Sequence, residues 1–282
     1  MAIDTEPSIN IRNLVLEDPK KELSGPFLPS RDILESDWAA IRQLLAGSTY
    51  TEWRRVMATG VGILDPKKLE GIDLSREIED LKAYLKIELG SNPLSPDSNP
   101  NIAVLERLFQ LKVLDPQAFK DLRINHNPNQ WPSLARSVKN WSSNISGYGQ
   151  YAKYFVLTAP PDVHLNREEE TGRELLLFCR PNKALGGWDG VLNTAANLKI
   201  VFPDQIEQLN LNEEFWNHFK DEMSIWREES LYWSTFVETA LNLAFLSASN
   251  IRSDESGIHL DFNPQDSQID PETSLQPERR KF

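Results

Sequence analysis

The sequence holds a single cysteine, Cys179. One thiol cannot form an intrachain disulfide, and it cannot supply the several thiolates of a structural zinc site. Cys179 ends the apolar run LLLFC, so we expect its side chain to be buried and unreactive. The sequence therefore excludes a disulfide-stapled fold and a thiolate zinc module.

Histidine is also scarce, and the four that are present are widely separated: His126, His164, His218 and His259. None of them belongs to an HExxH motif. The nearest approach to a metal-ligand spacing is His218 with Asp221 and Glu222, which share one face of an expected helix. A solvated polar stripe explains this spacing better, so we expect no metal site.

Motifs for nucleotides and covalent catalysis are missing as well. The sequence contains neither GxxxxGK[ST] nor GxGxxG, and it has no GxSxG nucleophile elbow. The glycine-containing segments 147–149 and 186–190 are interpreted as turns between helices, and the acidic clusters 168–170 and 213–214 as first turns of helices. We therefore expect no cofactor and no catalytic residues, and we do not expect an enzyme.

No apolar run reaches the length of roughly 18 to 20 residues that a membrane helix needs, and no signal pattern begins the chain. The formal net charge of −12 would repel phosphate backbones and anionic lipid surfaces. These two features argue against membrane and nucleic-acid partners. They favour a cytoplasmic location.

What the sequence does contain is a recurring helical outline. Prolines that end a helical pattern stand at Pro66, Pro116, Pro160 and Pro203, at intervals of 50, 44 and 43 residues. Each interval holds two helical stripes with a period of 3.6, for example over residues 75–89, and a short apolar connector. No strand-like alternation runs long enough to predict a sheet. The sequence predicts an all-α fold of about five stacked helical hairpins, 43–50 residues each.

The expected domain limits follow from where this pattern begins and ends. We expect residues 1–10 and 262–282 to be disordered and residues 11–261 to form one helical-repeat domain, with irregular caps at 11–35 and 247–261. Residues 90–100 are interpreted as a loop insertion within the array, although the same composition would suit a linker between two domains.

The hinge of the repeat stands as GVGILDP, FQLKVLDP and ANLKIVFP. These segments resemble the hinges of degenerate helical-hairpin repeats in uncharacterised bacterial proteins, within the broad tetratricopeptide and HEAT kind. The resemblance covers roughly residues 36–248 and implies a right-handed solenoid or a compact helical array with irregular ends. It also implies a binding or scaffolding role, but the tetratricopeptide pattern of small residues and tyrosines is missing, so no groove residues carry over.

Two functions remain open at this point. The first is a non-catalytic scaffold that binds a protein or peptide; in a variant of this function, the tail ending in PERRKF is the docking peptide and the helical array merely presents it. The second is an all-helical enzyme or a protein that binds a small ligand or metal between its helices. Most tryptophans fall on apolar stripes and are expected in the core. Aromatic residues near turns are the candidate partner contacts: Tyr148, Tyr151, Trp226 and Tyr232.

Overall fold

The computed structural model describes residues 33–90, 101–122, 124, 129–141, 144–179, 188–206, 209, 224–228, 232–248, 250–254 and 256–261. This part of the chain is almost entirely helical, with one small β-hairpin, so the predicted all-α class is confirmed. The predicted disordered ends, most of the amino-terminal cap and the insertion after residue 90 lie outside the described residues.

The hinge prolines mark helix ends as predicted. Four helices stop two residues before such a proline: α5 (Thr51–Leu64), α7 (Ala103–Leu114), α10 (Ile145–Thr158) and α12 (Trp188–Val201). Proline constrains its predecessor away from helical angles, and Asp65 and Asp115 accordingly have extended backbone angles with ψ of 94° and 82°.

The connectors after these hinges are more ordered than the sequence suggested. Instead of an irregular apolar stretch, a new short helix begins at the proline itself in three hinges: η1 (Pro66–Leu69), α8 (Pro116–Asp121) and α13 (Pro203–Ile206). Asp65 Oδ1 accepts from the Lys67 amide at 3.2 Å, and Asp115 Oδ1 accepts from the Ala118 amide at 2.9 Å. Aspartate at the amino cap and proline at the first position are both favourable, so the Asp-Pro pair ends one helix and starts the next.

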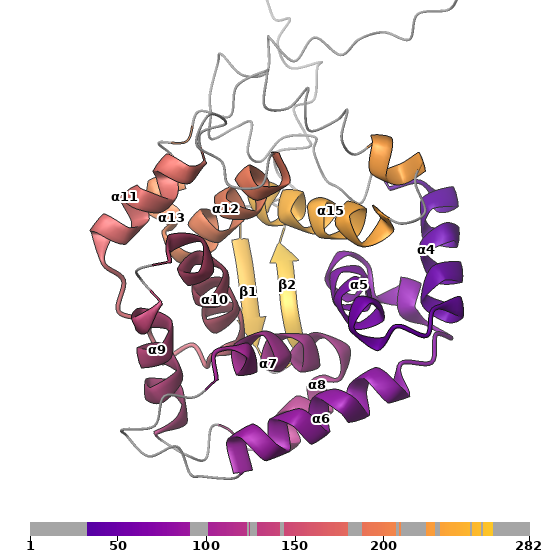
Figure 1. Cartoon of the computed structure of the whole chain (residues 1–282), viewed down its shortest axis with the longest axis horizontal. Coiled ribbons are helices and arrows are strands. Elements are labelled where there is room, and N and C mark those ends of the chain that lie inside the picture. Colours follow the sequence, from indigo (N-terminus) through magenta and orange to yellow (C-terminus); the bar gives the residue numbers. More distant parts are fainter. Residues whose placement is uncertain are drawn as a thin grey trace, which may run out of the picture.

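The remaining helices complete two concentric groups (Figure 1). At the periphery lie α4 (Glu35–Gly47), α6 (Ser75–Gly90), α9 (Gln130–Asn140) and α11 (Glu169–Phe178). Inside them, α5, α7, α10, α12 and α15 (Trp233–Ser247) form what we call the inner ring.

The inner ring is closed. Each of its helices packs against the next in the order α5, α7, α10, α12 and α15, and α15 packs in turn against α5. At this last contact a Cβ on Gly60 would lie 2.5 Å from Cγ1 of Val237, so glycine lets the two helices approach closely. An open solenoid keeps its first and last units apart. Of the two arrangements predicted, the contacts are therefore those of a compact helical array.

The hairpin was not predicted. Strands β1 (Asn250–Asp254) and β2 (Gly257–Asp261) pair antiparallel, with Ile251 opposite Leu260. Gly257 has φ of 137°, which a residue with a Cβ rarely adopts. Residues 247–261 are thus not an irregular cap beyond the array: β1 contacts α10, β2 contacts α5 and α7, and the hairpin crosses the centre of the inner ring in Figure 1.

The tryptophans only partly follow the expected burial. Trp131 and Trp233 are in the core, with 4% and 7% of their surface exposed, whereas Trp53 is half-buried. Trp141 is 38% exposed and packs edge-on against Tyr151, with 5.3 Å between ring centroids. Trp216 lies outside the described residues. Within the described ranges, none of the helices has the length and apolar character that crossing a membrane requires.

Candidate functional site

Polar side chains are buried on the helices of the inner ring, where an ordinary helical core would be apolar. Every one of its five helices contributes some of them: Arg55, Thr59, Gln110, Lys112, Lys153, Thr158, Thr194, Asn197, Thr239, Asn242 and Ser247. Buried polar groups need hydrogen-bond partners, so the partners of each group show which of them hold the fold together.

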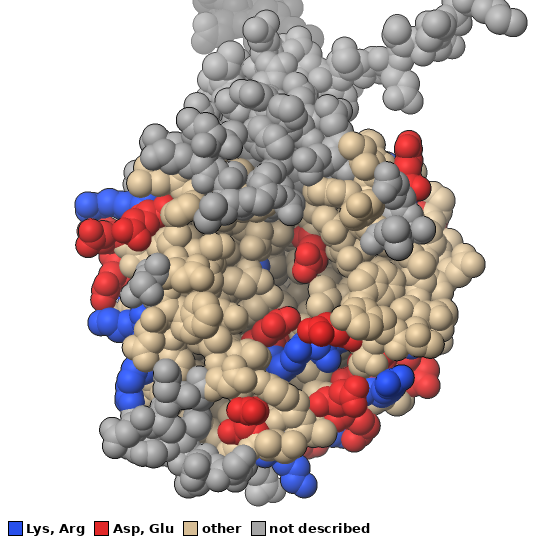
Figure 2. Space-filling model, viewed as in Figure 1, with Lys and Arg blue, Asp and Glu red and all other residues tan. Residues whose placement is uncertain are grey.

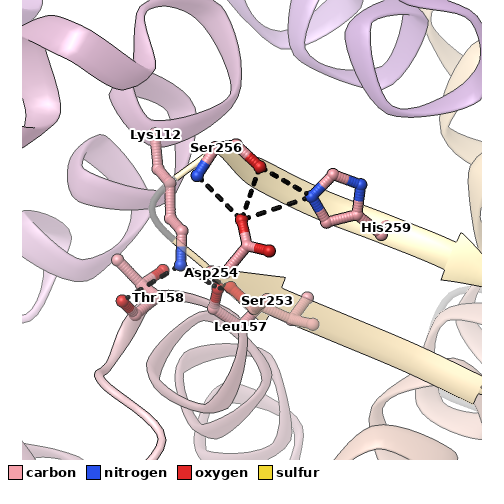
Figure 3. A network of polar contacts seen from close by, with 7 residues as sticks. All are labelled: Lys112, Leu157, Thr158, Ser253, Asp254, Ser256 and His259. Atoms are coloured by element: carbon pink, nitrogen blue, oxygen red, sulfur yellow. Dashed lines mark hydrogen bonds and ion pairs between the residues drawn. The ribbon is translucent and has the colours of Figure 1, made fainter.

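Two lysines have a structural role. Lys112 Nζ donates to the carbonyl oxygens of Leu157 and Thr158, at 3.2 and 3.4 Å, and contacts Ser253 Oγ on β1 (Figure 3). Lys199 Nζ donates to the carbonyl oxygens of Leu246 and Ala248, the latter at 2.5 Å. Both lysines occupy the LK position of the repeated hinge, and both bind carbonyl groups at the carboxyl end of the next inner helix, which have no partner within the helix.

Lys153 is different. It is only 5% exposed, and its ammonium nitrogen donates to Asn193 Oδ1 of α12 at 3.1 Å, the one acceptor found for it among the described residues. The nitrogen also lies 5.5 Å from the centre of the Tyr154 ring. Burial lowers the pKa of Lys153 from 10.5 to about 8, although the nearby carboxylate of Glu238 on α15 acts in the opposite direction.

The next turn of α10 continues the polar surface. Gln150 Nε2 donates to the Tyr154 hydroxyl at 2.5 Å, and the Tyr154 ring packs on Phe109 of α7 with 4.9 Å between centroids. Burial raises the pKa of Tyr154, and the charges of Glu106 and Glu238 raise it further. Tyr154 is therefore a neutral phenol over the whole physiological range.

Two amide groups in this region have an unfilled hydrogen-bonding position. Gln150 Oε1 and Asn197 Oδ1 are both buried, and neither has a partner within the part of the chain that the structure describes. Exchanging the O and N of either amide would leave its nitrogen without an acceptor instead. We call Gln150, Lys153, Tyr154, Asn193, Asn197 and Glu238 the central polar cluster.

A glycine on α10 makes room for this cluster. A Cβ on Gly149 would lie 2.9 Å from Leu175 Cδ2 and 3.3 Å from Asn197 Nδ2. Residues 147–149 were expected to form a turn, but they lie in the first half of α10. Gly147 contacts Trp141 in the same way, at 2.9 Å from a built Cβ. The glycines therefore serve close helix packing, which is why they resembled turn punctuation in the sequence.

A second set of charged residues, here called the rim network, joins α5 to α7. Glu52 Oε1 lies 3.5 Å from Arg55 Nη2 and 3.2 Å from Arg107 Nη2. Arg107 Nη1 donates to Gln110 Oε1 and Gln110 Nε2 donates to Glu106 Oε1, both at 3.1 Å. Burial and the charge of Arg107 lower the pKa of Arg55. Through Glu106, whose charge also acts on Tyr154, the rim network adjoins the central polar cluster.

The surface is hollowed at the centre of the inner ring. Seen in the direction of Figure 1, acidic and basic side chains gather around this hollow over the inner helices (Figure 2). Glu52 and Glu238 are exposed, whereas Lys153 is buried. The carbonyl oxygen of Leu157 on α10 accepts a hydrogen bond from Ser253 of the hairpin. Lys153 lies before Leu157 on the same helix, about 6 Å away along the helix axis.

The hairpin carries a Ser-His-Asp group of its own (Figure 3). Ser256 Oγ donates to Asp254 Oδ1 at 2.6 Å, and His259 Nε2 lies 3.0 Å from the same hydroxyl and 3.3 Å from the same carboxylate oxygen. These contacts lower the pKa of Asp254 to about 2. Because the serine proton goes to Asp254, Nε2 donates to Ser256 rather than accepting from it, which is the reverse of a nucleophile with its base. The group fastens the turn.

The predicted partner contacts are placed differently from one another. Tyr148 is 3% exposed and belongs to the core, where burial raises its pKa to about 12, so the expectation of a surface contact is corrected. Tyr151 and Trp226 are half-buried, the former against Trp141. Tyr232 is 43% exposed. The structure does not bring the four together into the central polar cluster.

The other sequence candidates add nothing to the site. Cys179 is 2% exposed, its thiol points to the Leu175 carbonyl oxygen at 3.4 Å, and burial raises its pKa to about 12, as expected of an unreactive thiol. His218, Asp221 and Glu222 lie outside the described residues. Within those residues, no group of three or more histidine, cysteine or acidic side chains could hold a metal ion.

Sequence reasoning missed the central polar cluster although a signal was present. Single polar residues interrupt nearly continuous apolar runs, as in YAKYFVL around Lys153 and LFQLKVL around Gln110. A helix that is apolar on all sides is buried, so a lone polar residue within it faces other protein groups rather than solvent.

Comparison of the chain with known proteins found no matching protein-family model, no matching curated protein and no matching solved structure.

Proposed function

We propose that this protein binds a small polar molecule in the hollow at the centre of its inner ring, between Lys153 and Glu238. This is the second of the two functions that the sequence left open. The observation that carries it is the buried Lys153 ammonium, which has one hydrogen-bond acceptor among the described residues, beside two amides whose oxygens have no partner within the same residues. Pockets for small ligands commonly combine apolar walls with a few convergent polar groups.

The hydrogen-bond partners distinguish Lys153 from two lysines with a structural role, the buried Lys112 and the partly buried Lys199. The nitrogens of Lys112 and Lys199 each bind two backbone carbonyl oxygens, which accounts for their burial. An ammonium has three donor hydrogens, and Lys153 uses one of them on Asn193. Because a buried charge with incomplete hydrogen bonding is costly, a ligand that completes those bonds gains the corresponding free energy.

The chemistry of the cluster defines the class of ligand. Lys153 offers donors to a carboxylate or carbonyl oxygen, and Glu238 accepts from a hydroxyl or an ammonium group. The free amide positions of Gln150 and Asn197 add directional hydrogen bonds. A hydroxy acid, an amino acid or a hydroxylated carbonyl compound has both kinds of group.

A panel of such compounds tests the proposal. Ligand-observed NMR with purified full-length protein would survey small hydroxy acids, amino acids, polyols and sugar phosphates. We expect at least one class to bind, and we expect Lys153→Met and Glu238→Gln to weaken that binding by at least about tenfold because each removes one charged contact. Lys199→Met is the matched control, since it replaces a partly buried lysine of lowered pKa outside the cluster, and it should leave binding unchanged.

The result that would overturn the proposal is equally clear. If no class binds, or if every compound that binds the wild type binds Lys153→Met equally well, the hollow is not a ligand site. The scaffold function then becomes the leading proposal. The scaffold function predicts that partners recovered with the intact protein are lost when Tyr232 is replaced or, where the tail is the docking peptide, when residues 263–282 are deleted.

A further inference from the structure

We propose that Lys153 is a covalent attachment point: its amine forms an imine with the carbonyl carbon of a small aldehyde or ketone bound in the hollow. The inference rests on the proposed function and narrows it to carbonyl compounds. It concerns a residue type for which sequence motifs give no signal, because imine formation needs a suitably placed amine rather than a sequence pattern.

The geometry around Lys153 favours a reactive amine over a structural one. The nitrogen is held by Asn193 Oδ1 at 3.1 Å, which fixes its position with a single hydrogen bond. The Tyr154 ring flanks it at 5.5 Å, and the Gln150 amide bonded to Tyr154 has a buried oxygen with no hydrogen-bond partner among the described residues. When the amine is neutral, it has two N–H groups and a lone pair. One N–H goes to Asn193, and the lone pair remains available to attack.

The environment also supplies the neutral amine. An exposed lysine is almost wholly protonated at neutral pH, and its ammonium form has no lone pair to donate. Burial shifts the balance for Lys153 toward the neutral form, and its pKa of about 8 leaves a substantial neutral fraction near pH 7.5. The charged groups that act on this region come from two helices: Glu238 on α15 acts on both Lys153 and Tyr154, and Glu106 on α7 acts on Tyr154, which is itself a neutral phenol.

The reaction balances without any further reagent. The lone pair of Lys153 attacks the carbonyl carbon, and one amine proton moves to the carbonyl oxygen to give a carbinolamine. The remaining amine proton leaves with the hydroxyl group as water, so amine and carbonyl compound yield imine and water with no oxidation. Protonation of the imine restores the positive charge at Nζ, and the Glu238 carboxylate compensates that charge as it does for the ammonium.

Reductive trapping tests the inference on the wild-type protein. Glycolaldehyde or pyruvate is added with sodium cyanoborohydride near pH 7.5, and the modified lysines are identified by peptide mass spectrometry over time. We expect Lys153 to be alkylated at least about tenfold faster than the average exposed lysine, in line with its larger neutral fraction. Lys199 is the internal control, because burial lowers its pKa to about 8 as well while its nitrogen binds the Leu246 and Ala248 carbonyl oxygens.

The outcomes separate this inference from the proposed function. Modification of Lys153 no faster than Lys199 with both probes overturns imine formation, and Lys153-dependent binding in the NMR panel would then leave the non-covalent site standing. If Lys153 is modified no faster than Lys199 and no compound shows Lys153-dependent binding, both the imine and the non-covalent site are excluded. Because the trapping uses the wild-type chain, the result does not depend on whether a Lys153 variant folds.

Discussion

Replacing Lys153 with methionine should change how stability depends on pH. Methionine has a similar length and stays apolar at every pH, so the variant keeps the packing and loses only the titrating group and its bond to Asn193. The quantity of interest is the free energy of unfolding of the wild type minus that of the variant. Other titrating groups, such as Lys199 and Tyr148, are present in both proteins and cancel in this difference.

The sign and the size follow from the pKa of Lys153. Folding lowers it from 10.5 to about 8, so between these values the unfolded chain holds a proton that the folded protein has released. Stability then rises with pH across this window, and the full cost of burying the ammonium is present below pH 8. The pKa difference corresponds to about 3 kcal/mol, of which between about 2 and 3 kcal/mol should appear from pH 7 to pH 10.

Urea unfolding at pH 7, 8, 9 and 10 measures this difference, with tryptophan fluorescence and circular dichroism as independent signals of a two-state transition. We expect the free energy of unfolding of the wild type to rise relative to that of Lys153→Met at each pH step above 8. A difference that stays constant within about 0.5 kcal/mol would mean that the Lys153 ammonium is not desolvated in the folded protein. The chemical argument for its reactivity would then fail as well.

Two further predictions concern the ring itself. Gly60→Ala should destabilise the protein by about 1–3 kcal/mol, because its Cβ would lie 2.5 Å from the stiff side chain of Val237. The control is Gly47→Ala, which should be neutral or stabilising by up to about 1 kcal/mol because nothing lies within 4 Å of its Cβ. Thermal unfolding compares the two variants, and equal stabilities would contradict the close packing of α5 on α15. Lys112→Met should lower the free energy of unfolding by about 1–3 kcal/mol, because it removes a donor from the Leu157 carbonyl oxygen. Amide hydrogen exchange should become faster in residues 250–254, since Lys112 also contacts Ser253. Unchanged protection there would refute the role of Lys112 in holding the hairpin.

The helix limits could be read from the sequence because their causes are local. Proline at 66, 116 and 203 stops a helix for steric reasons that no tertiary contact removes, and the structure ends α5, α7 and α12 there. The short helices that begin at these prolines were also within reach. Aspartate is a favoured amino-cap residue, so Asp65 and Asp115 indicate a helix start as well as the helix stop that the following proline indicates.

Closure of the ring had no local signature. The apolar stripe of a hairpin has the same period whether the hairpins curve gently or return to their start, so the contact of α5 with α15 depends on small angles summed over the whole array. The hairpin escaped notice because its strands are five residues each, too short for an alternation to stand out. The central polar cluster could not be predicted from the sequence, because Lys153 and Asn193 come into contact only when α10 and α12 pack together.

The closing contact between Gly60 and Val237 also sets an order of events while the chain is being made. Residue 60 leaves the ribosome long before residue 237, so the amino-terminal helices must wait as an incomplete arc with Lys153 and its neighbours in water. The ring can close only once α15 has been synthesised, and the hairpin that crosses its centre follows still later in the chain. We therefore expect Lys153 to be an ordinary, solvated lysine in the unfinished chain and to acquire its lowered pKa only when the ring has formed around it.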